Sequence, residues 1–290
     1  MTSGPASTRR LWEAVERFHS GPVYLEPECR EAAAEAGARG FWMGYFATRA
    51  APLGAVGPAA VGAIFFYFAP ARVARALPDA WDFTTPQALI DARYRGVETA
   101  LRRLLGDRFD DGATAEAAAL ARRAAIAGST VARPLYAGWS AMPWPQEPAV
   151  ALWHAATLLR EHRSGGHAVA LAAAGLDGCE SVVSHVAVDE APHEWIEGEA
   201  GWTADEAAAA RHRLRDRGWL DGTGRATAAG RAGRAEVEGL TDRLDAAPWL
   251  ALTGAERERL LELLGPLDAC FRPDDQLDWQ ELYGPNRSTG

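Results

Sequence analysis

Arg49 is the residue whose type and position most clearly suggest chemistry, because it stands inside the apolar stretch of residues 41–52. A guanidinium in apolar surroundings needs a partner, since an unpaired buried charge is costly. That partner is either an internal carboxylate or helix carbonyl groups, or the carboxylate or phosphate of a small ligand. Aromatic residues nearby either pack the core or form the walls of a ligand pocket. The candidate ligand-binding residues are Trp42, Tyr45, Arg49, Tyr67 and Arg163.

A histidine cluster is the second candidate for chemistry. His154, His162, His167 and His185 fall within 32 residues, close to Glu180. Imidazoles exchange protons near neutral pH or bind metals, but histidines that bond to backbone carbonyls or cap helices explain the cluster equally well. This cluster contains no His-Glu-x-x-His motif and no Glu-x-x-His pair, so no metal site is predicted, and the cofactor stays unknown. The catalytic candidates of an enzyme would be His162, His167, Glu180 and His185.

Helical patterns run through nearly the whole chain and must position these side chains. Thr85 and Pro86 resemble an N-cap and a first helical residue. The Ser164-Gly165-Gly166 run predicts a break between two helices, and three prolines in residues 142–148 predict an irregular boundary. We expect helices at residues 11–18, 27–36, 40–50, 58–68, 70–77, 86–105, 113–127, 149–162, 168–174, 176–186, 204–217 and 227–244. We therefore expect an N-terminal all-helical region at 1–140 and a second region at 149–290.

Residues 201–244 have the order of the second half of a winged helix. Thr203 and Glu206 form a capping box, and Gly218 ends the helix that follows. Residues 219–221 and 225–227 can pair as a small hairpin, and a second helix starts at Thr227. The expected fold class is mainly α, with an N-terminal helical region and a winged-helix-derived C-terminal region that contains one small β-hairpin and a helical extension.

The charges expected of a DNA-reading helix are missing from this segment. The chain carries a net charge of -9, and residues 201–246 contain eight acidic residues and eight arginines. Ala207, Ala210 and Leu214 have the spacing of a buried face, which leaves alanines and Asp205 outward at the helix start. We favour a retained scaffold. DNA binding stays open as the alternative, with Arg213, Arg217 and Arg225 at phosphates.

Four motifs resemble a family of actinobacterial proteins of about this length that are described as helix-turn-helix or MarR-like. They are GFWMGYFATRAAPLG at 40–54, FYFAPARVARALPDAW at 66–81, LWHAATLLREHRSGGHAVALAAAGLDGCE at 152–180, and GW, LRDRGWLD and TDRLDAAPW within 201–249. The resemblance implies a winged helix and implies no activity. Relatives read like HRGDGH where this chain has HRSGGH at 162–167, so a carboxylate is missing from that segment.

Composition excludes several classes of protein. All thirty basic residues are arginine, so no Schiff-base or P-loop lysine exists. Cys29, Cys179 and Cys270 are widely separated, which predicts neither a zinc clamp nor a disulfide framework. The longest apolar stretch, residues 55–71, is interrupted by glycines and prolines, so we expect no membrane span and a cytoplasmic protein.

The sequence thus predicts a small-molecule-binding protein with a pocket between its two regions. Its ligand would be anionic and partly apolar or aromatic, and His/Glu acid–base chemistry would make it an enzyme. The alternative is a ligand-responsive, MarR-like transcriptional regulator that binds DNA as a homodimer.

Overall fold

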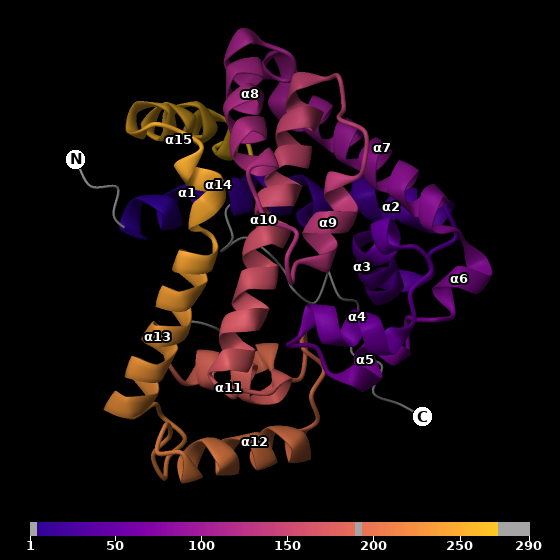
Figure 1. Ribbon diagram of the computed structural model, residues 1–290. Helices are drawn as coiled ribbons and strands as arrows, with labels where there is room; N and C mark the ends of the chain where they lie inside the picture. Colours follow the sequence, from indigo (N-terminus) through magenta and orange to yellow (C-terminus); the bar gives the residue numbers. More distant parts are fainter. Residues whose placement is uncertain (1–4, 189–192, 272–290) are drawn as a thin grey trace.

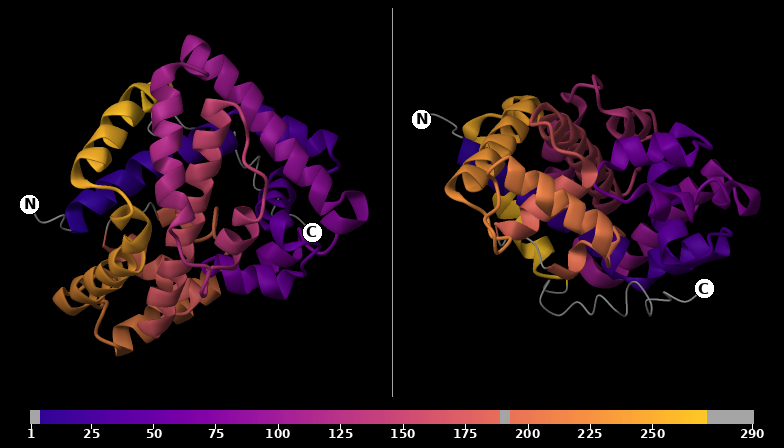
Figure 2. Two further views of the ribbon diagram at one scale, coloured as in Figure 1. Left: turned by 45° about the horizontal axis from the view of Figure 1, so that its top comes forward. Right: turned by 90° about the horizontal axis from the view of Figure 1, so that it is seen from below.

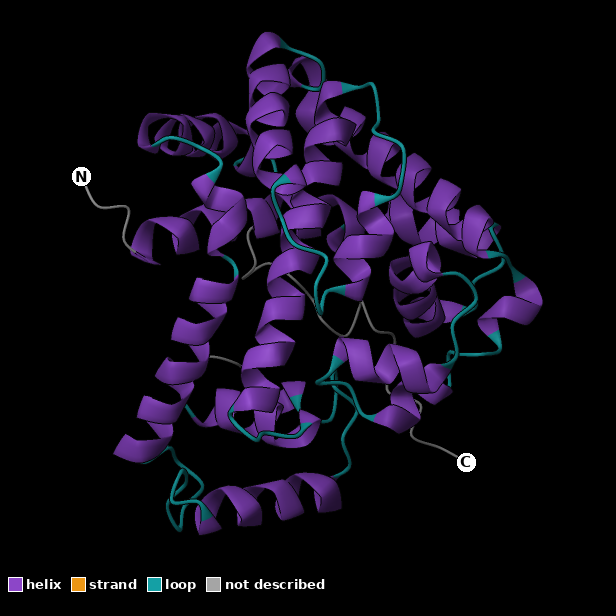
Figure 3. Cartoon of the chain, in the orientation of Figure 1, coloured by secondary structure: helices purple, strands orange, loops and turns teal. Residues whose placement is uncertain are grey.

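The computed structural model describes residues 5–188 and 193–271, and every regular element in these ranges is helical (Figures 1 and 3). The α-helices are α1 (Pro5–Ser20), α2 (Pro27–Glu35), α3 (Gly40–Ala50), α4 (Pro58–Phe65), α5 (Pro70–Ala74), α6 (Ala80–Phe83), α7 (Pro86–Leu105), α8 (Gly112–Ile126), α9 (Pro134–Ser140), α10 (Pro148–Ala173), α11 (Gly178–Ala187), α12 (Ala204–Asp216), α13 (Ala228–Leu244), α14 (Ala246–Leu250) and α15 (Gly254–Asp268). Short 3-10 or π turns lie at Gly21–Leu25, Ala51–Leu53, Gly106–Arg108 and His193–Trp195.

Local sequence signals set several of these boundaries. Helices α3 and α7 have the predicted bounds, and the Thr85 hydroxyl accepts a hydrogen bond from the backbone N–H of Ala88 at 3.2 Å. The capping box of Thr203 and Glu206 begins α12 as predicted. Proline at the first helical turn and a side-chain oxygen at the N-cap satisfy or remove otherwise unpaired N–H groups. The mainly α part of the expected fold is therefore confirmed.

The predicted break at Ser164-Gly165-Gly166 is wrong, because α10 runs through it as one helix. The glycines serve close packing instead. A Cβ on Gly165 would lie 2.7 Å from Cγ of Arg133, and one on Gly166 would lie 3.3 Å from Cβ of Leu244. Glycine lets neighbouring segments of the chain approach this face of the helix, and the surrounding packing overrides its low helix propensity.

The predicted β-hairpin is also wrong, and with it the winged-helix assignment. In the described ranges there is no β-strand, and the segment between α12 and α13 contains one isolated bridge, Leu220 with Ala226. The Asp221 carboxylate accepts bonds from the backbone N–H groups of Thr223 and Arg225, which folds the chain into a turn. Because Thr227 already caps α13, too few residues remain to form paired strands.

Two hydrophobic clusters fill the interior. The larger one gathers α1, α3, α7, α8 and the first part of α10, and α15 joins it by packing on α1 (Figure 2). The smaller one contains the end of α10, α11, α12 and part of α13, which we call the α11–α13 region. Helix α10 passes from one cluster to the other (Figure 1). A division of the chain near residues 140–149 stays a prediction.

Candidate functional site

A cavity of about 810 Å³ lies where the two clusters meet; we call it the central cavity. Its walls come from α1, α3, α4, α10, α11 and α13, and from the segments around residues 66–67, 132–135 and 195. The lining includes the aromatic residues Trp12, Phe65, Phe66, Tyr67 and Trp195, the basic residues Arg9, Arg49, Arg133, Arg160, Arg163 and Arg234, the histidines His167 and His185, and the carboxylates Glu161 and Glu238. Arginines outnumber carboxylates on this wall, so its formal charge is positive.

Arg49 reaches this wall and has an internal partner there. Its side chain is 5% exposed and forms an ion pair with the fully buried Glu161, with Nη2 at 2.9 Å from both carboxylate oxygens. Its Nη1 donates to the hydroxyl of Tyr45 at 2.7 Å. Burial opposes ionisation of Glu161, but Arg49 and Arg160 outweigh it and lower the pKa of that carboxyl. Glu161 thus holds the guanidinium in place at the cavity wall.

The aromatic candidates divide between the cavity and the core. Tyr67 lines the central cavity, next to Phe66 and Trp195. Tyr45 does not line it and lies behind two lining residues, Arg49, to which it is hydrogen-bonded, and Phe65, on which its ring packs. Trp42 packs on Phe46 and Phe68 and lies under the guanidinium of Arg72. The structure therefore brings Tyr67, Arg49 and Arg163 together and leaves Trp42 and Tyr45 outside the cavity.

Backbone strain gathers at the same wall. Phe66 and Ala132 are the non-glycine residues with positive φ in the described ranges, at 55° and 56°, and both line the central cavity. The N–H of Tyr67 bonds to the carbonyl of Phe65 at 2.7 Å, which makes a tight γ-turn at Phe66. Left-handed or γ-turn backbone at a bulky residue persists only where its surroundings hold it, and such residues cluster at ligand sites.

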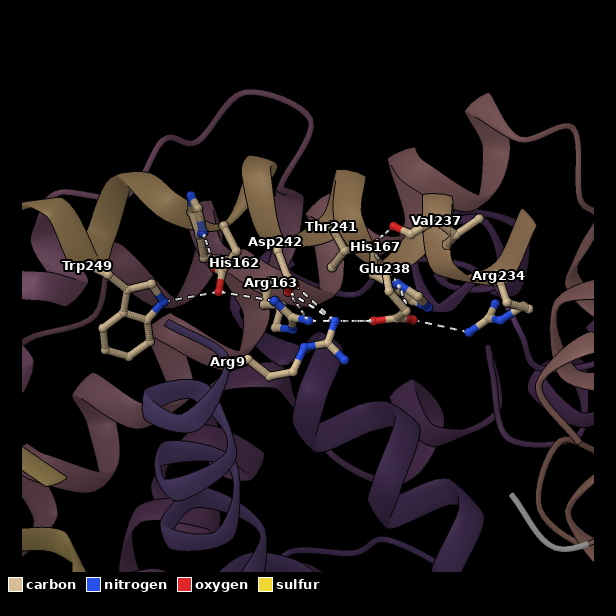
Figure 4. A network of polar contacts seen from close by, with 11 residues as sticks. Arg9, His162, Arg163, His167, Arg234, Val237, Glu238, Thr241, Asp242 and Trp249 are labelled. Atoms are coloured by element: carbon tan, nitrogen blue, oxygen red, sulfur yellow. Dashed lines mark hydrogen bonds and ion pairs between the residues drawn. The ribbon is translucent and has the colours of Figure 1, made fainter. Parts of the chain in front are cut away.

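Helix α13 presents a row of carboxylates to α1 and α10 (Figure 4). Glu238, Asp242 and Asp245 follow one another at spacings of four and three residues, which places them on one helix face. Arg9 lies 3.1 Å from both Glu238 and Asp242, and Arg163 lies 2.8 Å from Asp242. This network ties α1, α10 and α13 into one side of the central cavity.

Arg133 also lines the central cavity, and no carboxylate in the described ranges forms an ion pair with it. It is 8% exposed, and its three donor nitrogens bond to backbone carbonyls, those of Val131, His162 and Leu244. Burial lowers the pKa of its guanidinium, although nearby Asp245 acts in the opposite direction. The pKa of a guanidinium lies so far above neutral that Arg133 keeps its charge, so an anion in the cavity would be attracted to it.

The histidine candidates do not form one site. His167 and His185 line the central cavity, where Nδ1 of His167 lies 2.9 Å from the hydroxyl of Thr241. His162 lies outside it. Its Nδ1 is 3.0 Å from the carboxylate of Asp245, and its ring forms a T-shaped contact with Tyr136. His154 is fully buried in the larger cluster against Tyr94 and Trp144.

Glu180 has a local role in the structure. It completes the capping box of α11 with Asp177 and accepts a bond from Arg213 at 2.9 Å. It does not line the central cavity, so the structure separates it from His167 and His185.

Burial lowers the pKa of both cavity histidines to about 4. Arg234 lowers the pKa further in each case, and Glu238 opposes it. Both rings are therefore neutral near pH 7 and offer hydrogen bonds without charge. A general base is most effective when its pKa lies near the working pH. Histidines with a pKa of about 4 are therefore better suited to ligand binding than to proton transfer at neutral pH.

The exposed side of α12 carries few groups that could read DNA. Ala207, Ala210 and Leu214 are buried as predicted. The outward residues at its start are Ala204, Asp205, Ala208 and Ala209. Methyl groups and a carboxylate bind no phosphates, and among base edges they suit only a thymine methyl or a cytosine amino group.

The arginines considered for DNA contact make internal bonds. Arg213 donates to Asp177 at 2.6 Å and to Glu180, and Arg217 donates to two carbonyls in the turn between α10 and α11. Arg225 is exposed in the turn after α12. Phosphate binding by Arg213 would have to replace two charge-assisted hydrogen bonds.

Sequence reasoning missed most of the charged residues at this site. Glu161 and Arg160 stand directly beside the predicted helix end at residue 162, and Arg133 precedes Pro134 in a segment to which no element was assigned. The spacing of Glu238, Asp242 and Asp245 on a predicted helix is the signal that could have found the carboxylate row. No group of three or more His, Cys, Asp or Glu side chains that could hold a metal occurs in the described part of the chain.

These features define a mainly helical protein with a positively charged cavity between the larger hydrophobic cluster and the α11–α13 region. The chain matches the model of a helix-turn-helix family over residues 8–276, and it belongs to that family. No curated protein and no solved structure matches it. The actinobacterial and MarR-like parts of the resemblance stay predictions. Among the residues that the structure describes, no helix has the length and apolar character needed to cross a membrane.

Proposed function

We propose that this helix-turn-helix protein binds a small anionic molecule with an apolar or aromatic part in its central cavity. The observation that carries the proposal is the lining, in which six arginines face two carboxylates and stand among aromatic side chains. A volume of about 810 Å³ falls within the range of small-molecule sites, which are mostly apolar with a few polar groups. Arg133 would attract the anion, and Phe65, Tyr67 and Trp195 would contact the apolar part.

The two cavity histidines would act as neutral hydrogen-bond partners of the ligand. With pKa values near 4, His167 and His185 transfer few protons near neutral pH. An enzyme working by acid–base catalysis would need the bound anion to raise one of these pKa values. Ligand binding without chemistry is therefore the function that we place first.

Anilinonaphthalene sulfonate is a suitable probe, because phenylnaphthylamine has the same ring system without the sulfonate. The matched variants are Ser164→Glu and Ser164→Gln, since Ser164 is exposed and lines the cavity. We expect fluorescence titration to give tighter binding of the sulfonate than of the amine. Ser164→Glu should weaken the sulfonate alone by about fivefold, the effect of about 1 kcal/mol between charges in water-like surroundings. Equal binding of both probes, or equal effects of both variants, would contradict the proposal.

A ligand-responsive regulator that binds DNA as a dimer is the second candidate, and membership of a helix-turn-helix family is the observation that favours it. Gel-shift assays with genomic fragments at two salt concentrations test it. Salt-sensitive binding with sequence preference would establish this function and require contacts other than the engaged Arg213 and Arg217. Native mass spectrometry of the freshly purified protein would report the oligomer and any retained ligand together.

A further inference from the structure

A second, smaller cavity of about 210 Å³ lies in the larger hydrophobic cluster, between α2, α3 and α7. It shares no lining residue with the central cavity. Its outer end carries the exposed Arg30, and its inner end is formed by the buried Thr48 and Arg93. Its other walls are mostly small or apolar.

Arg93 is buried there without a counter-ion. It is 3% exposed, and only its Nη1 donates to a side chain, the hydroxyl of Thr48 at 3.1 Å. Its Nε and Nη2 are buried and have no hydrogen-bond partner among the described residues, and no carboxylate there forms an ion pair with it. Glu161, a buried carboxylate that influences this part of the core, is already bound by Arg49 and Arg160. Two nitrogens of a fixed charge that donate no hydrogen bond are costly unless something binds them.

Tyr24 adds a second unused polar group at the same place. Its hydroxyl is buried without a partner, its ring lines the cavity, and the guanidinium of Arg93 lies 5.7 Å from the ring centre. The neighbourhood is electropositive: burial and then Arg160, Arg93 and Arg49 lower the pKa of His19 well below its ordinary value. A hydroxyl and a forked guanidinium beside one cavity match the oxygens of a carboxylate.

We propose that this small cavity is a second binding site, which takes a small carboxylate that carries one ring or a short apolar chain. Its volume supports a ligand of that size. A dry cavity of about 150 Å³ holds benzene, and this one of about 210 Å³ has room for a carboxylate besides. The carboxylate would lie against Nε and Nη2 of Arg93 and the Tyr24 hydroxyl, and the ring would pack between the small residues of α2 and α3.

Benzoate and its neutral analogue benzamide test the site by calorimetric titration of the full chain. We expect saturable binding of benzoate and at least about tenfold weaker binding of benzamide. Arg93→Met should abolish benzoate binding, and it should raise the midpoint of thermal unfolding without ligand, because it removes a buried charge that aromatic rings and Thr48 contact but no carboxylate in the described ranges pairs with.

Gly44→Leu is a second variant that leaves the charge in place. Gly44 lines the cavity, and a Cβ there would meet nothing closer than 3.8 Å, so Gly44→Ala is tolerated while a leucine side chain fills the space. Gly44→Leu should abolish benzoate binding, and Ser164→Glu in the central cavity should not change it. Absence of benzoate binding, or binding that survives Arg93→Met and Gly44→Leu, overturns the proposal. If Ser164→Glu weakened benzoate binding instead, benzoate would bind in the central cavity, and this result would also overturn the proposal. Because the two cavities share no residue, failure of either proposal leaves the other standing.

Discussion

Replacing Arg49 with methionine and Glu161 with glutamine, singly and together, would measure the ion pair at the wall of the central cavity. The side chains are 5% and 0% exposed, so neither charge faces bulk water when its partner is removed. The two substitutions are not equivalent. Without Arg49, the Glu161 carboxylate still accepts a bond from Arg160 at 3.1 Å. In Glu161→Gln, Arg49 keeps the amide oxygen and the Tyr45 hydroxyl as side-chain acceptors, but no carboxylate in the described ranges then forms an ion pair with it.

Glu161→Gln should therefore cost more stability than Arg49→Met. Breaking a buried ion pair from one side costs about 3–5 kcal/mol, and we expect about 5 kcal/mol for Glu161→Gln and about 3 kcal/mol for Arg49→Met. The double variant leaves Arg160 paired with Glu16 at 3.0 Å. It should be more stable than the sum of the single effects by about 2 kcal/mol, the interaction energy of two residues in direct contact.

Urea unfolding followed by tryptophan fluorescence gives these free energies from the midpoint and slope of each transition. Arg259→Met and Glu116→Gln form the matched control, because this pair has a similar distance of 2.8 Å but both side chains are nearly half exposed. Hydration and entropy leave little net stabilisation in such surface pairs. A loss for Glu161→Gln no larger than for Glu116→Gln, or additive effects in the double variant, would refute the reasoning. Glu161→Gln should also tighten binding of anilinonaphthalene sulfonate, because it removes a negative charge from the cavity wall.

Two further predictions concern pH and packing. Burial lowers the pKa of the fully buried His154 to about 4, so below about pH 6.5 this group binds more protons in the unfolded chain than in the folded one. Its contribution to stability, fully present above that pH, should fall by about 3 kcal/mol on the way to pH 4. His167 and His185 titrate in the same range, so urea unfolding should show a loss for His154→Gln that is smaller than that of the unchanged chain by about 3 kcal/mol. Gly165→Ala should lower the free energy of unfolding by about 1–2 kcal/mol, because its Cβ would lie 2.7 Å from Cγ of Arg133. Gly239→Ala in α13, whose Cβ would meet nothing nearer than 3.6 Å, should raise it by up to about 1 kcal/mol; a gain at Gly165 would show that Arg133 does not depend on this close approach.

The sequence predicted best those elements whose limits are set locally. Helix α7 begins and ends as expected because Thr85 and Pro86 fix its start and Gly106, with positive φ, follows its last residue. The predicted hairpin failed for a local reason, the turn at Asp221, whereas the predicted break in α10 failed because of tertiary packing. Gly165 signals a break by propensity, and only the position of Arg133 shows why a glycine stands inside a helix there.

The site was predictable in part. Arg49 was recognisable as a buried charge, and the internal carboxylate, one of the two partners left open for it, is Glu161. Arg93 was overlooked although it carried a signal. It stands four residues after Leu89 and four before Val97, on the apolar stripe of a predicted helix, where a charge is unexpected. Its missing counter-ion depends on α3 and α10, which are distant in sequence, so the spacing alone could not show it.

Arginine explains how an acidic chain can hold positive charge in its interior. A buried lysine can shed its charge by losing a proton, but a guanidinium stays charged and needs an anion or carbonyl groups around it. Of the buried arginines that line the two cavities, Arg49, Arg163 and Arg234 have carboxylate partners in the described ranges. Arg133 and Arg93 do not, and one lies at each cavity. The chain has a net charge of -9 and therefore many carboxylates, yet none forms an ion pair with Arg133 or Arg93 in the described ranges. An anion bound from solution would supply the missing counter-charge at each cavity.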